Sequence, residues 1–407
     1  MSFRFRHEPA KQPAMSPYKR KVLHLGGFDP RGARFYHQLL GEQVEHANAM
    51  ATAQGDPLRL KLSPRRRQGH DSAWEVTRSD GACRTEIQFL AWDDVVRLHW
   101  PKGAATLLAR MIPTYWHFMT RGKWREIFIV PRGSKIALIY PALMVARLAL
   151  PGALLVWLAS GLLLYHHAWL WALALLPALL VATLVAIPLV ERAHGLWLLR
   201  FVIFNDLLAR QRTDPALDAR LDEFAATLSA CLDEAGRGEW DEVLLVTHSN
   251  GSILAMPIMA RLLALRDGEL PDQFSLVTLG GSITLVGFRR DAEAFHAQLD
   301  RVATAQFHWL DIGSPTDGAS IPLVNPCITR PVGPPPGLIQ LSPRWHRYCD
   351  PATYKARRAD KYLTHFDYLR RLDKPSALDY IGLTSAPRPL AQSIAAFQHE
   401  NGATENA

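Results

Sequence analysis

The chain has 407 residues, 48% of them hydrophobic and 21% charged, which is enough to bury a sizeable core in one large domain or two ordinary ones. This composition excludes a disordered protein. The formal net charge is +8, but the basic residues gather in short groups with no nucleic-acid module around them, so we expect no nucleic-acid partner.

The cysteines bear on redox state and metal binding. They are scattered along the chain without the spacing of a zinc site or a disulfide framework. We therefore expect reduced thiols. The residues concerned are Cys83, Cys231, Cys327 and Cys349.

The first strand is predicted near the N-terminus. Residues 1–20 are polar and contain no apolar segment, so no signal peptide is expected. A short apolar run, Val22 to Leu25, ends in Gly26-Gly27-Phe28, and a helix is predicted from Arg34 to Met50. Paired glycines at a strand end let backbone amides approach a phosphate or a developing oxyanion. The spacing fits no nucleotide-binding loop, and a tight turn without a ligand remains the alternative.

Residues 51–83 are polar and rich in turns, and we assign no element to them. The alternation from Thr85 to Ala91 predicts a further strand. Asp93 and Asp94 follow it, and two such aspartates are typical of a helix N-cap and its neighbour rather than of a metal site.

A long apolar segment separates the two halves of the chain. Between Lys135 and Glu191 the only charged side chain is Arg147. A bilayer core requires about 20 apolar residues per helix, so this segment has room for two spans. We predict a hairpin, with spans at 148–165 and 168–190 and a turn at 165–167. A buried soluble helical hairpin is the alternative, although soluble helices normally keep a polar face.

The charges flanking this hairpin predict its orientation. Basic residues from Arg121 to Lys135 precede it, Arg192 and Arg200 follow it, and the turn has neither Lys nor Arg. The positive-inside rule then places both termini in the cytoplasm, and we expect an integral protein of a bacterial inner membrane. Some of the excess positive charge can rest on anionic headgroups.

Strands and helices alternate through the second half. This alternation indicates a parallel α/β sheet, whose sites lie beyond the carboxyl ends of its strands. The predicted elements are a helical stretch over 201–235 divided near Pro215, a strand beginning at Glu242, a helix at 252–265, and strands at 274–279, 307–310 and 344–348.

The sequence Thr247-His248-Ser249-Asn250-Gly251 lies where the strand from Glu242 gives way to a helix. A serine on such a sharp turn has an exposed hydroxyl and can act as a nucleophile. The motif resembles the nucleophile elbow of the α/β-hydrolase superfamily, usually G-x-S-x-G. Gly251 matches that pattern, whereas Thr247 replaces its first glycine.

The resemblance implies a Ser, Asp, His order along the chain. Asp317, in a loop after a predicted strand, resembles the acid of this superfamily, and Asp311 at the strand end is the competing candidate. His365 matches the position of the histidine. His308 and His346 lie within predicted strands and are expected to be structural.

The same resemblance implies an oxyanion hole formed by the amide of Asn250 and that of Gly27 or Phe28. No metal or organic cofactor is needed. The implied fold is a mostly parallel α/β-hydrolase-like sheet with helices on both faces, interrupted by the transmembrane hairpin. We place the two parts of the domain at 21–135 and 192–385, the hairpin at 136–191 and a C-terminal tail at 386–407.

The expected function is that of an esterase-like or lipase-like serine hydrolase. Ser249, Asp317 and His365 would form a catalytic triad that cleaves an acyl ester through an acyl-enzyme. Its location at a membrane favours a lipid or lipophilic ester as substrate. The alternative is a catalytically inactive hydrolase-like membrane protein with a binding or scaffolding role.

Overall fold

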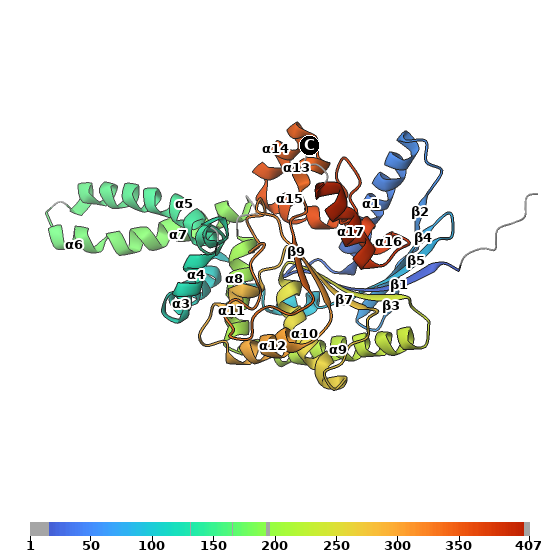
Figure 1. Ribbon diagram of the computed structural model, residues 1–407. Helices are drawn as coiled ribbons and strands as arrows, with labels where there is room; N and C mark the ends of the chain where they lie inside the picture. The colour runs from blue at the N-terminus through green and yellow to red at the C-terminus, as the bar shows by residue number, and fades with distance from the viewer. Residues whose placement is uncertain (1–15, 131, 165, 193–195, 403–407) are drawn as a thin grey trace, which may run out of the picture.

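A computed structural model of the chain describes residues 16–130, 132–164, 166–192 and 196–402, with the backbone alone at 132–138. Within these ranges a single sheet lies at the centre of the molecule, and a pair of long helices projects to one side (Figure 1). The strands are β1 (Tyr18–Leu25), β2 (Leu60–Leu62), β3 (Arg66–Gln68), β4 (Asp71–Arg78), β5 (Cys83–Phe89), β6 (Glu242–His248), β7 (Phe274–Leu279), β8 (His308–Ile312) and β9 (Leu338–Leu341).

The sheet is mixed, with a parallel majority. Its order is β2-β4-β5-β1-β6-β7-β8-β9, with β3 also paired to β4. Across the sheet from β5 through β1 to β9, every adjacent pair of strands is parallel, whereas β4 runs antiparallel to β5, β2 and β3. The predicted α/β class is confirmed at this level. The three antiparallel strands, β2, β3 and β4, all lie within residues 51–83, for which the sequence predicts no element, and tight turns rather than helices join neighbouring strands there.

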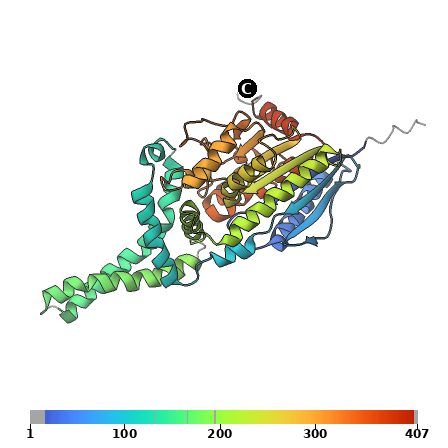
Figure 2. The ribbon, with the colours of Figure 1, turned by 90° about the horizontal axis from the view of Figure 1, so that it is seen from below.

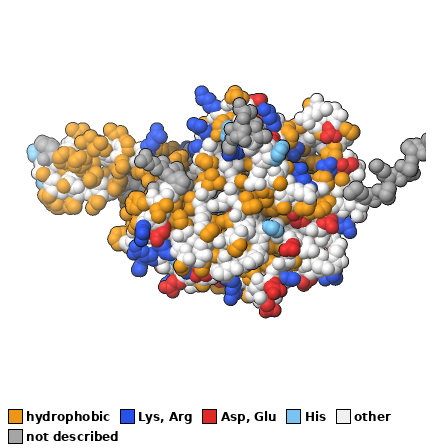
Figure 3. Space-filling model, viewed as in Figure 1, with side chains coloured by type: hydrophobic (Ala, Val, Ile, Leu, Met, Phe, Trp, Pro, Cys, Tyr) orange, Lys and Arg blue, Asp and Glu red, His pale blue; other side chains and the backbone are white. Residues whose placement is uncertain are grey.

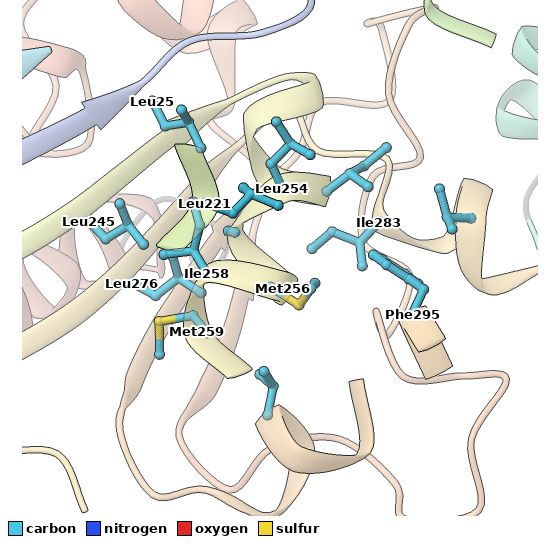
Figure 4. Close-up of a cluster of buried hydrophobic side chains, with 14 of the residues drawn as sticks. Leu25, Leu221, Leu245, Leu254, Met256, Ile258, Met259, Leu276, Ile283 and Phe295 are labelled. Atoms are coloured by element: carbon cyan, nitrogen blue, oxygen red, sulfur yellow. The ribbon is translucent and has the colours of Figure 1, made fainter. Parts of the chain in front are cut away.

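Helices cover both faces of the sheet (Figures 1 and 2). One face carries α1 (Ala33–Ala53), α16 (Tyr380–Ser385) and α17 (Leu390–Gly402), and the other carries α9 (Pro215–Gly236), α10 (Asn250–Leu265) and α12 (Glu293–Thr304). Successive residues of β6 alternate between them: Leu245 packs with α9, α10 and α12 (Figure 4), whereas Leu244 packs on the opposite side with α1. This two-sided burial explains why the strand is continuously apolar.

The projecting pair of helices corresponds to the predicted hairpin. One arm is α5 (Arg132–Leu164), and the other comprises α6 (Ala168–Leu173) and α7 (Leu175–Arg192). Two stretches, Ile139–Leu164 and Ala168–Arg192, are long and apolar enough to cross a membrane. Of the predicted turn, His166 and His167 separate the helices, and Tyr165 lies outside the described residues. The first helix begins at Arg132, well before the predicted span at 148–165. It continues through Pro141 and Pro151 and ends at neither of them.

Four helices connect the hairpin to the sheet. They are α2 (Asp93–Leu98), α3 (Ala104–Arg121), α4 (Trp124–Ile129) and α8 (Trp197–Ala209). Leu107 of α3 and Leu199 of α8 share a buried cluster with Val145 and Ile187 of the hairpin. Asp93 and Asp94 lie in the first turn of α2, but the N-cap is Trp92 rather than either aspartate.

The predicted last strand, Arg344 to Tyr348, is wrong. These residues include the short helix α13 (Trp345–Tyr348), and β9 lies a few residues earlier, at Leu338–Leu341. Trp345 and Tyr348 are both buried. Their spacing of three residues places them on one side of a helical turn, where a strand would turn them to opposite faces.

The remaining helices are α11 (Ile283–Gly287), α14 (Pro351–Ala359) and α15 (Lys361–His365), with a short 3₁₀ turn at Asp367–Leu369. The predicted tail contains α17, which buries Leu390, Ile394 and Phe397 against the domain. This helix is therefore part of the packed structure.

Candidate active site

Ser249 lies on the turn between β6 and α10. Its backbone has φ +57° and ψ −123°, a conformation that residues other than glycine rarely adopt. The Ser249 amide donates to the carbonyl of Leu279 at 2.9 Å. The turn is tight because Gly251 approaches β1 closely: a methyl group there would lie 2.5 Å from the carbonyl oxygen of Leu25.

Thr247 takes the position at which the G-x-S-x-G pattern has its first glycine. Its side chain is fully buried, and its hydroxyl lies 3.1 Å from that of Ser252. Space for Ser252 comes from Gly281, where an added methyl group would lie 2.9 Å from the Ser252 Cβ. Gly281, which lies outside the motif, therefore provides room beside Thr247 and Ser252 that the first glycine of the usual pattern would otherwise give.

The glycine turn after β1 lies directly against Ser249. A methyl group on Gly27 would be 2.8 Å from the Cβ of Ser249 and 3.1 Å from its Oγ. Phe28 is buried and stacks on Phe204 of α8, with ring centroids 4.6 Å apart. Asn250 begins α10, where the first backbone N–H groups have no partner within the helix. The residues predicted for the oxyanion hole thus lie around the serine.

His365 and Asp317 form a buried pair. Nδ1 of His365, at the end of α15, is 2.8 Å from Oδ2 of Asp317, and both side chains are almost fully buried. Burial alone would raise the pKa of Asp317, but His365 and the hydrogen bond from the Ala319 amide outweigh it and hold that pKa below its usual value. Nε2 of His365 has no hydrogen-bond partner among the described residues.

Asp311, the competing candidate for the acid, lies within strand β8. It accepts hydrogen bonds from the Thr278 hydroxyl at 2.7 Å and from the Gln340 amide at 2.9 Å. Burial raises the pKa of Asp311. Of the other two histidines, His308 is exposed on β8 and His346 lies on α13, whereas the ion pair that Asp317 forms is with His365.

His248, for which the sequence predicts no role, packs against His365 with ring centroids 4.9 Å apart. Nε2 of His248 lies 2.9 Å from the backbone oxygen of His365. Burial, with a smaller effect from His365, holds the pKa of His248 well below its usual value. The ring is therefore neutral, and because a carbonyl only accepts, Nε2 carries the proton. In the sequence, its position next to Ser249 is the one sign that His248 belongs to this site.

Ser249 and His365 line one pocket of about 310 Å³. Gly27 and Phe28 form another part of its wall. The rest of the wall is largely aromatic and charged, and it includes several residues close in sequence to the hairpin: Glu191, Leu196, Trp197 and Arg200. A larger cavity of about 630 Å³ adjoins α2, α3 and α8 but contains none of the predicted site residues.

Comparison with known proteins gives no guide to this site, because no protein-family model, curated protein or solved structure matches the chain.

Proposed function

We propose that this protein is a membrane-anchored serine hydrolase that cleaves an acyl ester. The observation that carries the proposal is the buried His365–Asp317 pair: His365 lines the same pocket as a serine on a strained strand-to-helix turn, and its Nε2 has no hydrogen-bond partner in the described part of the chain. A nucleophile, a base and a group that orients the base are the parts that acyl transfer needs.

The proposed reaction begins at the hydroxyl of Ser249. Its Oγ attacks the ester carbonyl carbon while its proton passes to Nε2 of His365. Asp317 stays ionised, accepts from Nδ1 and stabilises the imidazolium. The intermediate then expels the alcohol, which takes the proton from Nε2 and leaves an acyl-enzyme.

Water completes the cycle. It transfers a proton to His365 as its oxygen attacks the acyl carbon, and the acid leaves as Ser249 regains its proton. In each half-reaction the negative oxygen would be stabilised by the amides of Asn250 and of Gly27 or Phe28. The proposal requires no cofactor.

The substrate class we propose is a lipid or other lipophilic ester. Glu191 lies in the last turn of α7, and Trp197 and Arg200 follow in α8; all three line the pocket. If the hairpin crosses a bilayer, this wall of the pocket lies beside the membrane surface. The charge of Arg200 is balanced by Glu191, 2.8 Å away, so the wall does not favour an anionic substrate.

A fluorophosphonate probe tests the nucleophile in the full-length protein in native membranes. We expect labelling of the wild type and of Ser229→Ala, a control on α9, and none of Ser249→Ala. Equal labelling of Ser249→Ala, or no labelling of the wild type, would remove the basis of the hydrolase proposal. The second result would favour a binding or scaffolding role.

A pair of substitutions tests which aspartate orients His365. Asp317→Asn should lower kcat for a p-nitrophenyl ester by about 10³–10⁴-fold, because the imidazole loses the group that orients it. Asp311→Asn, which retains a carbonyl oxygen for Thr278 or Gln340, should stay within a few-fold of wild type. The reverse pattern would assign the role to Asp311.

A further inference from the structure

Large apolar side chains are exposed on α3 and α4, outside the hairpin. Each exposes between 61% and 70% of its surface, although monomeric soluble proteins rarely group such side chains. We call these residues the α3–α4 apolar face; they are Ile112, Trp116, Met119, Phe128 and Ile129.

The helix α3 is apolar on more than one side. Leu107 and Phe118 are buried, and Met111 and Tyr115 pack against the cluster that α3 shares with the hairpin helices. Ile112, Trp116 and Met119 follow one another at spacings of four and three residues, which places them on one stripe away from the buried side. The domain therefore leaves this stripe uncovered.

The position of the face indicates what covers it. The helix α3 contacts α7 and α8 and lies across the base of the hairpin (Figures 1 and 2). Phe128 and Ile129 end α4, and the long hairpin helix begins at Arg132. The exposed surface of the hairpin is itself apolar (Figure 3), so the face continues a surface suited to lipid.

The charge around the face is strongly one-sided. Residues 95–135 contain eight Lys or Arg but one acid, Glu126. Arg110, Arg121 and Arg125 are exposed, and none forms an ion pair within the described part of the chain. Basic side chains beside an apolar stripe are typical of a helix that lies in the headgroup region of an anionic membrane.

We propose that the α3–α4 apolar face lies in the interfacial layer of an anionic bilayer and holds the domain against the membrane next to the hairpin. The hairpin alone would tether the domain while leaving it free to tilt. With two contacts on the bilayer, the domain keeps one orientation, and the pocket wall formed by Glu191, Trp197 and Arg200 stays at the membrane surface. This inference rests on the proposed membrane insertion of the hairpin.

The test uses full-length protein with one introduced cysteine carrying an NBD fluorophore, since the four native cysteines are buried. The protein is reconstituted in phosphatidylglycerol-containing vesicles with spin-labelled quencher lipids. The labelled variants are Ile112→Cys on the face, Leu155→Cys on the hairpin and, as a control, His70→Cys in the exposed turn between β3 and β4, outside both of these surfaces.

We expect strong quenching at residues 155 and 112 and none at residue 70. Replacing phosphatidylglycerol by phosphatidylcholine, or introducing Arg121→Gln with Arg125→Gln, should reduce quenching at residue 112 at least two-fold and leave residue 155 unchanged. This pattern would support an anionic lipid surface as the occupant.

Quenching at residue 155 but not at 112 would overturn the inference while leaving the hairpin in the membrane. Energy transfer between labels at residue 112 that disappears on dilution in lipid would overturn it in favour of a second copy of the chain. No quenching at residue 155 would overturn both the inference and the membrane anchor. Fluorophosphonate labelling of Ser249 is independent of each result, so the hydrolase proposal is judged separately.

Discussion

The backbone at Ser249 is held by residues that have no reactive groups of their own. Gly251 gives the turn its close approach to the end of β1, and Gly27 leaves room for the serine side chain. A strained conformation persists only where its surroundings hold it in place. The two glycines supply space, while the hydrogen bond from Ser249 to Leu279 supplies restraint.

Gly27→Ala tests this requirement for space. The new methyl group would lie 2.8 Å from the Ser249 Cβ, so either the serine or the loop must move. A displacement of about 1 Å costs roughly 100-fold in rate. We expect kcat for a p-nitrophenyl ester to fall by about 10–100-fold with little change in melting temperature.

Gly41→Ala, in α1, is the control for this substitution. Its methyl group would meet Leu62 at an ordinary 3.6 Å, and alanine favours the helix. This variant should retain full activity. Equal activity in Gly27→Ala would show that the serine does not need this space.

Buried histidines predict that acid destabilises the protein. Burial lowers the pKa of His24 to about 3, and His248 is lowered in the same direction. Below the unfolded pKa of about 6.5, the unfolded chain takes up protons that the native state refuses, so stability is lost as pH falls. Each histidine should cost about 1.4 kcal/mol between pH 7.5 and pH 5.5.

Thermal unfolding of the detergent-solubilised protein, followed by tryptophan fluorescence at both pH values, measures this effect. His24→Gln should reduce the loss of stability between pH 7.5 and pH 5.5 by about 1.4 kcal/mol, the contribution of one histidine, even if it lowers stability at both pH values. His70→Gln, at an exposed position, should leave the dependence unchanged. The idea fails if His24→Gln retains the full dependence.

At the level of elements, one ion pair ties the C-terminal segment to the centre of the sheet. Arg20 of β1 lies 2.7 Å from Glu242 of β6, and both are buried. The guanidinium also donates to the backbone oxygens of Ala386 and Arg388, and Glu242 accepts from the amide of Leu390 at the start of α17. Two neighbouring strands and a helix remote in sequence thus share one polar contact.

Arg20→Met should therefore be strongly destabilising. It leaves the Glu242 carboxylate buried without its cation, which costs about 3–5 kcal/mol. Denaturant unfolding measures the loss, and limited proteolysis should cut near residues 386–390 sooner than in the wild type. Arg84→Met, which breaks a largely exposed pair with Glu75 on adjacent strands, should cost less than about 1 kcal/mol. Similar losses in the two variants would contradict this view of the Arg20 pair.

At the scale of the whole molecule, the hairpin and its basic flanks predict a topology. If the two apolar helices cross a bacterial inner membrane, the positive-inside rule places the sheet in the cytoplasm. Green fluorescent protein fused after Ala407 should then fluoresce in a bacterial host. Alkaline phosphatase inserted between His166 and His167 should be active. An active phosphatase at the C-terminus instead would place the domain on the other side.

Much of this architecture follows from local pattern. The strand ending at His248 was predictable because it is buried on both faces and therefore continuously apolar, and the hairpin because almost no charge interrupts it. The contact between Asp317 and His365 was predictable only through the order of residues in a resembling superfamily. The spacing of the two residues along the chain does not by itself indicate that they touch.

Other features depend on contacts that the sequence does not display. The strands β2 and β3 are short and partly exposed, so they lack an apolar period. The helix α13 has four residues, too few to show a helical repeat, and was mistaken for a strand. The packing of His248 and Trp197 against His365 brings together residues more than 110 positions apart.

The place of the hairpin in the chain has a consequence for biosynthesis. The strand β1 pairs with β6 over Arg20 to Leu25, yet β6 begins more than 200 residues later, after both apolar helices. During translation, β1 and β5 leave the ribosome with an open edge that only β6 can cover. The apolar helices emerge before that edge closes, so if they insert into a membrane, insertion precedes completion of the sheet. A ribosome stalled before residue 242 would then carry a chain already held at the bilayer and still without its candidate nucleophile.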